Sequence, residues 1–268
     1  DILVERVCSL CRRDYAYAWI PLLSEKFSTE ILKPKSSRPG TIQLLRRRAP
    51  RLSINLSDHP DIDHFTEEVF GSKTRQSLRR KSRKLAEAGG IFSTLESPAD
   101  VVPWIDRVFA LENAAWKGKK GLSIFSKGAQ RAFYRLLFEN LSARGRLRLS
   151  VLTIEGEAAA CEVGLLSPGR YCMHTTAFDP RFSAHSPGRL LMLGSIERCF
   201  SEQRMVYDFM QNDQEFKRRM ANHAEHLWDW IVLPKSLRGL VLLAIVKAIQ
   251  NWTRWRESKK HPSDQKDL

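Results

Sequence analysis

The sequence has few cysteines and no long apolar segment. Its 268 residues include only five cysteines, an odd and sparse number that excludes a disulfide framework and predicts a reducing compartment such as the cytoplasm. The longest apolar run, Leu240–Val246, has seven residues and ends before Lys247. Because a membrane-spanning helix needs about 20 apolar residues, no transmembrane helix is expected.

Motifs for metal binding and serine hydrolysis are also lacking. The sequence contains neither H-E-x-x-H nor a G-x-S-x-G nucleophile elbow. His223 and His226 are expected on opposite faces of a strand, and Cys8 and Cys11 form a lone C-x-x-C without a second ligand pair. The sequence therefore predicts no metal site.

Positive charge is abundant. Forty-four Lys and Arg residues against 30 Asp and Glu give a formal charge of +14, which favours a polyanionic partner such as nucleic acid, phospholipid or a phosphate-bearing cofactor. Seven basic residues lie between Lys73 and Lys84, in a helix predicted over 74–87 and ended by Gly89–Gly90. This helix is either a solvated helix held by Leu78 and Leu85 or an anion-facing surface.

Hydrophobic periodicity predicts an α+β fold with one mixed, mainly antiparallel sheet flanked by helices. Strands with short turns at 146–154, 158–166 and 171–177 form a meander, and a helix over 189–203 leads to a strand at 205–210. The other predicted helices lie at 97–116, 126–143, 214–220 and 236–256, and the other predicted strands at 16–23, 42–45, 51–56 and 226–233. The strand-rich segment 1–60 shows no clearer organisation than this.

The candidate anion site is Ser186-Pro187-Gly188-Arg189, where a glycine-bearing loop precedes a helix. Free N–H groups and the helix dipole attract anions at such a position, and Arg189 adds charge. The predicted final helix combines apolar residues and tryptophans with Arg254, Arg256, Lys259 and Lys260. It either packs on a sheet or lies on a membrane surface.

Candidate catalytic groups lie on the meander and the strand after it. Glu162 and His174 face each other if the turn between their strands is a three-residue loop, and lie on opposite faces if it has four residues. Asp208 needs a partner because its neighbours are apolar. Lys217 is either that partner or, with Asp213, a substrate-binding group. Tyr207 is either a proton donor or a core residue.

Several motifs in order resemble the GNAT acyltransferase superfamily, most closely its CelD-like branch, associated with bacterial cellulose and exopolysaccharide synthesis and akin to Fem-type peptidyltransferases. The resemblance covers roughly residues 70–235. The motifs are R-R-K-x-R-K-L at 79–85, R-L-R-L-x-V-L at 146–152, G-E-A-A-A at 156–160, F-D-P at 178–180, S-P-G-x-L-L at 186–191, Y-D-F at 207–209 and F-K-R-R at 216–219.

The resemblance implies a GNAT-like core at 71–235, an N-terminal segment at 1–70 that is part of a first, truncated half, and a C-terminal helix and tail at 236–268. It implies that acetyl-CoA or another acyl-CoA binds where strands 171–177 and 205–210 splay apart. The pyrophosphate then rests on Ser186–Leu190. In the family's loop pattern Q/R-x-x-G-x-G/A, the first position is His185, the central glycine is Gly188 and the last is Leu190.

The predicted activity is acyl transfer to an amine or hydroxyl acceptor, such as a small molecule or a polysaccharide precursor. Glu162, His174, Asp208 and Tyr207 are the candidate catalytic residues. Two alternatives stay open: a Fem-type transferase that uses aminoacyl-tRNA, and a non-enzymatic basic module that binds nucleic acid or a membrane surface. The expected location is the cytoplasm, with peripheral contact to the inner membrane through the final helix.

Overall fold

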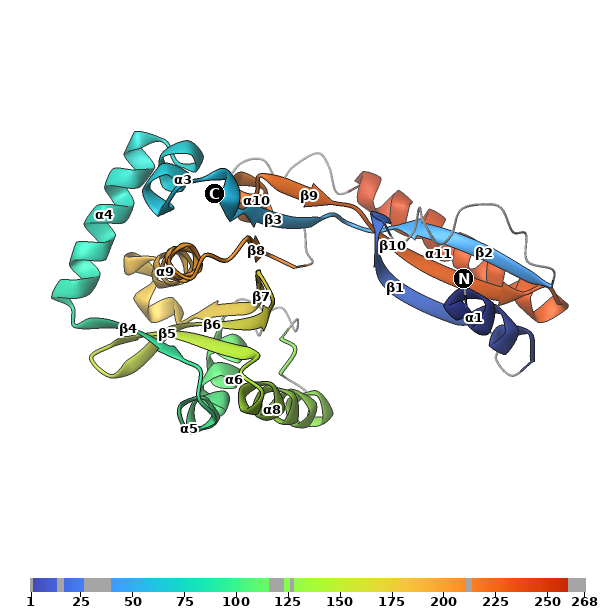
Figure 1. Ribbon diagram of the computed structural model, residues 1–268, viewed down its shortest axis with the longest axis horizontal. Helices are drawn as coiled ribbons and strands as arrows, with labels where there is room; N and C mark the ends of the chain where they lie inside the picture. Colours follow the sequence, from blue (N-terminus) through green and yellow to red (C-terminus); the bar gives the residue numbers. More distant parts are fainter. Residues whose placement is uncertain are drawn as a thin grey trace. The chain divides into compact units, whose positions relative to one another are not determined.

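The computed structural model describes residues 2–13, 17–26, 40–115, 123–125, 128–210 and 214–259 (Figure 1). The chain forms two compact units, one of residues 51–224 and one of residues 1–50 together with 225–268. Asp213 lies outside the described residues, so the structure gives no position for this predicted substrate-binding group.

A seven-stranded sheet in the order β4-β5-β6-β7-β8-β3-β9 organises the unit 51–224. Its pairs are antiparallel from β4 to β7 and between β8 and β3, whereas β7 and β8 run parallel. The strands are β3 (Arg51–Asn55), β4 (Gly90–Leu95), β5 (Leu147–Ile154), β6 (Glu157–Ser167), β7 (Arg170–Phe178), β8 (Val206–Asp208) and β9 (His223–Glu225). The predicted α+β class, the meander and the parallel crossover are confirmed.

Helices cover both faces of this sheet. They are α3 (Ile62–Val69), α4 (Ser72–Glu87), α5 (Pro98–Val101), α6 (Ile105–Ala114), α8 (Gly128–Ala143), α9 (Pro187–Ser201) and α10 (Glu215–Met220), with 3₁₀ turns η1 (Leu56–Asp58), η2 (Val102–Trp104) and η3 (Pro180–His185). Side chains alternate along β5, so Leu149 and Val151 join the core under α6 and α8, whereas Leu152 and Ile154 join the core under α4 and α9.

The described part of the other unit contains the three-stranded antiparallel sheet β1-β10-β2, with β1 at Ala18–Ser24, β2 at Thr41–Arg47 and β10 at Leu227–Pro234. Helix α1 (Ile2–Arg13) places Cys8 and Cys11 on one face, three residues apart, against Trp230 and Val232 of β10. The C-x-x-C pair therefore packs as small apolar side chains.

Helix α11 (Leu237–Lys259) contacts β10 and exposes large apolar side chains. Those with about half or more of their surface exposed are Leu237, Leu240, Val241, Ile245, Ile249 and Trp252. No helix among the described residues is long and apolar enough to cross a membrane.

Differences from the predicted elements have local causes. The predicted helix 97–116 is interrupted by the 3₁₀ turn η2, which contains Pro103. Helices α1 and α3 and strands β4 and β9 were not predicted. They are short or belong to segments where apolar residues show no clear period.

Candidate active site

Strands β7 and β8 separate after a short parallel contact. Arg170, Tyr171 and Cys172 pair with Val206, Tyr207 and Asp208, where β8 ends. Strand β7 continues to Phe178, and none of the described strands pairs with its outer edge beyond Cys172. Backbone N–H and C=O groups on this edge are therefore available to an extended ligand. This is the splayed strand pair that the resemblance implied.

Glu162 lies on β6 beside the strand separation and is fully buried. Two tyrosine hydroxyls, from Tyr171 at 2.7 Å and Tyr207 at 3.1 Å, donate to its Oε1 atom. The two tyrosine rings stack with centroids 5.1 Å apart, at the point where β7 and β8 pair. The structure therefore brings together two predicted catalytic residues, Glu162 and Tyr207.

Burial raises the pKa of Glu162 from its ordinary 4.5 to about 7, because the charged form loses its hydration. The hydroxyls of Tyr171, Ser195 and Tyr207 and the charge of Arg148 oppose this effect and lower the pKa. The pKa values of Tyr171 and Tyr207 lie well above 10, first through burial and then through the charge of Glu162. A carboxyl group with a pKa near neutral pH suits a general base.

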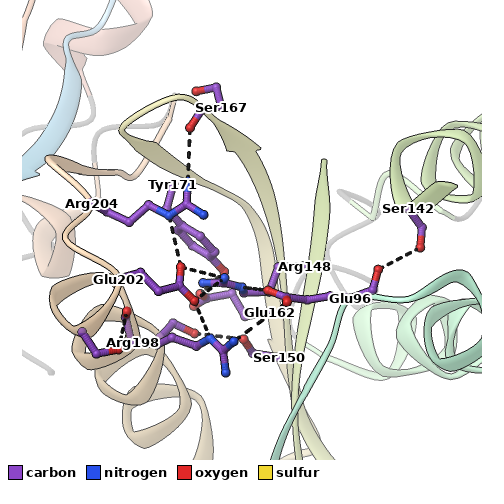
Figure 2. A network of polar contacts seen from close by, with 12 residues as sticks. Glu96, Ser142, Arg148, Ser150, Glu162, Ser167, Tyr171, Arg198, Glu202 and Arg204 are labelled. Carbon is purple, nitrogen blue, oxygen red and sulfur yellow. Dashed lines mark hydrogen bonds and ion pairs between the residues drawn. The ribbon is translucent and has the colours of Figure 1, made fainter. Parts of the chain in front are cut away.

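Arg148 lies on β5 beside this carboxyl group and is only 2% exposed (Figure 2). Its Nε donates to Glu96 at 2.6 Å, and its Nη2 donates to both carboxylate oxygens of Glu202 at 2.7 and 2.8 Å. Its guanidinium carbon is 5.7 Å from the centroid of the Tyr171 ring. Burial would raise the pKa of Glu202, but hydrogen bonds from Arg148, Arg198 and Arg204 and the charge of Arg148 lower it to about 2.

The loop before α9 concentrates positive charge at the start of a 15-residue helix. Ser186 adopts a left-handed conformation, with φ of 52°, and its hydroxyl accepts a hydrogen bond from Lys81 Nζ of α4 at 2.6 Å. A Cβ atom at Gly188 would lie 3.3 Å from the Phe178 ring at the end of β7. The basic helix α4 thus reaches the candidate anion site, and the backbone at Gly188 lies against β7.

The three other predicted cofactor-binding residues, His185, Arg189 and Leu190, differ in their exposure and contacts. His185 ends the 3₁₀ turn η3 and is half-buried. Arg189 follows on the first turn of α9, where its N–H bonds to the Ser186 carbonyl at 3.1 Å. Leu190 is 8% exposed and packs in the core with Leu191, and its N–H bonds to the Ser186 carbonyl at 3.2 Å. The predicted cofactor-binding role of Leu190 therefore has no support from its contacts.

The structure does not bring His174 to Glu162. A β-bulge in the β6–β7 pair makes His174 an extra residue, and Glu162 pairs with Thr176. The turn pairs Ser167 with Arg170 and Leu166 with Tyr171, which is the register of the four-residue turn and sets His174 on the face of Val163. That face is covered by α8, and the His174 ring centroid is 5.5 Å from Tyr134 and 6.2 Å from Phe138. The two residues therefore lie on opposite faces of the sheet.

Asp208 and Lys217 do not form a pair. Arg170 donates to Asp208 Oδ2 at 2.7 Å, and Arg51 lies 3.7 Å from the same oxygen. Asp208 Oδ1 accepts the backbone N–H of Met210. Lys217 is buried and donates to the Phe209 carbonyl oxygen at 2.8 Å. The interpretation of Lys217 as the partner of Asp208 is wrong, because Arg170 on the neighbouring strand supplies the charge.

One group of possible metal ligands occurs among the described residues, His59, His64 and Glu68. Asn222 Nδ2 lies beside this group, 3.0 Å from Asp58 Oδ2, 3.2 Å from the Asn55 carbonyl oxygen and 3.3 Å from His59 Nε2. His59 Nδ1 lies 3.2 Å from Glu68 Oε2, which is 4.0 Å from His64 Nδ1. His64 and Glu68 are exposed, and exposed acidic groups are common without a metal.

Several site residues were missed by sequence reasoning. Arg148, Tyr171 and Ser195 surround Glu162, and Glu112 of α6 is 1% exposed and accepts from Thr175 at 3.2 Å. A charged residue on the apolar side of a predicted helix was the available signal for Glu112. No local pattern marked Arg148, which alternates with apolar residues as on any half-exposed strand.

Residues 72–218 match the family described as acetyltransferase (GNAT) domain. This stretch is more than half of the chain, and the protein belongs to that family. The chain is thus a GNAT-type acyltransferase, and the predicted enzyme class is confirmed. No curated protein matches the sequence.

Solved structures share the fold at low sequence identity. FemX has a TM-score of 0.61 at 8% identity, over 85% of this chain and 75% of that chain. The C-terminal domain (DUF2156) of a lysylphosphatidylglycerol synthetase from Agrobacterium fabrum has 0.57 at 13%, over 90% and 76%. A conserved protein of unknown function from Bacteroides thetaiotaomicron has 0.56 at 13%, over 87% and 75%. These similarities support the GNAT-like and Fem-like fold, whereas the CelD-like branch stays a prediction.

Proposed function

We propose that this acyltransferase transfers an acyl group, in the first instance acetyl, from acyl-CoA to an amine or hydroxyl. The observation that carries the proposal is the separation of β7 from β8 beside a buried carboxyl group whose pKa is about 7. An extended thioester fits along the outer edge of β7, and its acyl carbonyl oxygen would accept backbone N–H groups of that edge.

Glu162 would act as the general base. Its carboxylate takes the proton of the acceptor N–H or O–H, and the freed lone pair forms a bond to the thioester carbonyl carbon. The C–S bond then breaks, and its electron pair stays on the sulfur of coenzyme A. Tyr207, whose raised pKa keeps its hydroxyl protonated, would protonate that thiolate and recover a proton from Glu162.

The pyrophosphate would bind at the start of α9. The backbone N–H of Gly188, the helix dipole and the side chains of Lys81 and Arg189 all favour an anion there. His185 and Ser186 line the approach to this helix end. Because Lys81 comes from α4, part of the basic helix would serve cofactor binding rather than general solvation.

Thermal stability with acetyl-CoA tests the proposal. Acetyl-CoA at millimolar concentration should raise the melting temperature of the wild type, because a ligand of the native state stabilises it. Gly188→Trp should abolish the increase, since a side chain there meets the Phe178 ring and would displace the backbone at the start of α9. Lys81→Ala should reduce it without adding bulk.

Gly128→Trp on α8 is the matched control, because no atom lies within 4 Å of a Cβ at that glycine. The control should retain the full response to acetyl-CoA. An unchanged response in both Gly188→Trp and Lys81→Ala would show that the pyrophosphate site is misplaced.

A second donor is aminoacyl-tRNA, which the resemblance to Fem-type transferases implies. The observation that favours it is the run of basic residues on α4, together with the FemX-like fold. The same thermal assay separates the donors. Tight, salt-sensitive binding of tRNA, together with no change of the melting temperature on addition of any acyl-CoA, would favour the aminoacyl donor.

We also propose that the unit carrying α11 touches an anionic membrane surface on the cytoplasmic side, as an enzyme of exopolysaccharide or cell-envelope synthesis would. The exposed apolar stripe of α11, beside Arg238 and Lys247, supports this proposal. Flotation with vesicles that contain phosphatidylglycerol should exceed flotation with neutral vesicles. Equal or absent flotation would contradict it.

A further inference from the structure

A cavity of about 630 Å³ lies within the unit 51–224, on the α9 side of the sheet. Its walls come from α3, α4, β4 and α9, and Ser150 of β5 contributes to the lining. The cavity is distinct from the outer edge of β7, because no residue of β7 or β8 lines it. The cavity borders the start of α9 through Leu190, but Ser186, Gly188 and Arg189 do not line it.

The lining is polar but balanced in charge. Arg75 and Arg79 oppose Asp63 and Glu197, so the formal charges cancel. Five lining residues carry hydroxyl groups on the α9 side of the sheet: Thr66, Ser82, Thr94, Ser150 and Ser195. Phe92 lines the same space and is 47% exposed. Hydroxyls with balanced charges suit a neutral ligand that has many hydroxyl groups, and a ring suits the C–H face of a sugar.

This lining is less suited to the phosphates of a donor. A polyanion needs an excess of positive charge, which the loop before α9 has and the cavity does not. One of the two arginines in the lining is already hydrogen-bonded within the protein, because Arg75 donates to the carbonyl oxygens of Glu67 and Phe70 at 3.2 and 2.8 Å. The charge distribution therefore separates a donor site from the cavity.

One end of the cavity lies beside the candidate base. Ser150 is directly opposite Glu162 in the pairing of β5 with β6, so both side chains point to the same face. Ser195 of α9 donates to Ser150 Oγ at 3.2 Å, and its hydroxyl also lowers the pKa of Glu162. A ligand in the cavity would therefore end next to the carboxyl group that the proposed reaction needs.

We propose that this cavity holds the body of the acceptor, a neutral polyhydroxylated molecule of the saccharide class. Its reacting group points toward Ser150, Ser195 and Glu162. The inference rests on the proposed acyl transfer, and it adds the place and the chemical class of the acceptor. Phe92 contacts one sugar face, and the hydroxyl-bearing side chains bond to the sugar hydroxyls.

Gly194 offers a direct test, because it lines the cavity and no atom lies within 4 Å of a Cβ built there. A Leu at this helical position fills the cavity without displacing its neighbours. Gly128→Leu in α8 is the matched control, since a Cβ there also meets nothing within 4 Å and the residue is not part of the lining. Phe92→Ala removes the exposed ring and leaves the core unchanged.

The probes are glucosamine, N-acetylglucosamine and cellobiose, with binding followed by saturation-transfer NMR. Wild type and Gly128→Leu should bind at least one probe. Gly194→Leu should lose binding, and Phe92→Ala should weaken it about threefold to tenfold, the effect of one ring contact worth ~0.5–1.5 kcal/mol.

Acetyl-CoA is titrated into the same four proteins, so that the two proposals fail separately. Saccharide binding that Gly194→Leu abolishes, without any acetyl-CoA binding, would support the cavity and refute the donor. Two results would overturn the cavity proposal and retain the acyl-CoA donor. In the first, acetyl-CoA binds and no saccharide does. In the second, both bind, and neither Gly194→Leu nor Phe92→Ala changes the saccharide binding.

Discussion

The buried carboxyl group of Glu162 predicts a pH-dependent stability with a definite sign. Its pKa rises from 4.5 to about 7 on folding, so the folded protein binds a proton more tightly than the unfolded chain. The contribution to stability is full below the unfolded pKa of 4.5 and is lost as pH rises through about 7. At 1.36 kcal/mol for each tenfold change in proton affinity, the loss is about 3 kcal/mol.

Glu162→Gln isolates this contribution. The amide has the shape of the protonated carboxyl group and does not titrate. The variant should therefore not show the loss of stability that accompanies ionisation of Glu162. We expect the stability of the wild type minus that of the variant to fall by about 3 kcal/mol between acid and mildly alkaline pH. Urea unfolding at a series of pH values measures the difference, and groups such as Glu202 that titrate equally in both proteins cancel.

Two further variants sharpen the experiment. Tyr171→Phe removes a hydroxyl that lowers the pKa of Glu162, so the transition should move to higher pH. Glu139→Gln, at a partly exposed position on α8, should leave the wild-type curve unchanged. Parallel curves for wild type and Glu162→Gln across the whole range would refute the reasoning. With activity established, the rate should also rise with pH through about 7 and be lost in Glu162→Gln.

Two other variants test the packing around this carboxyl group. Gly164→Ala should destabilise the protein by roughly 1–3 kcal/mol, because the new Cβ would clash with the Tyr171 ring. Chemical denaturation measures the change in the free energy of unfolding, with Gly128→Ala as the control. Equal stability of Gly164→Ala and the wild type would contradict the close approach. Arg148→Ala should cost about 3–5 kcal/mol, because it removes the partner of Glu202 and Glu96. It should also raise the pKa of Glu162 further, and an unmoved pH transition would show that the Arg148 charge does not act on that carboxyl group.

Local patterns predicted most of the elements in the sheet unit. The alternation in β5, β6 and β7, the glycine after α4 and the loop before α9 are set by residues close together in the sequence, so they can be read without the fold. The family resemblance rested on the same segments and placed Gly188 and Ser186 at the start of α9, where the structure has them.

Only the tertiary structure showed which residues the polar side chains of the site contact. The turn between β6 and β7 has the register that sets His174 on the α8 face, and the sequence had left this register open against the one that faces Glu162. Arg148 alternates as if it faced solvent, but α9 covers that face and buries it with Glu162. Asp208 pairs with Arg170 and Arg51 from neighbouring strands, at sequence distances that periodicity cannot read.

The sequence by itself determined the fold class through short-range periodicity and the excess of positive charge through composition. The family came from the resemblance of its ordered motifs to the GNAT superfamily, which the match to residues 72–218 confirms. The odd and sparse number of cysteines also predicted that there is no disulfide framework, and all five cysteines are free in the structure. Only the tertiary structure decided that Glu162 is buried with a pKa of about 7 and that a charge-balanced cavity lies beside it. Both depend on which faces the helices cover, and that is settled by contacts between residues far apart in the chain.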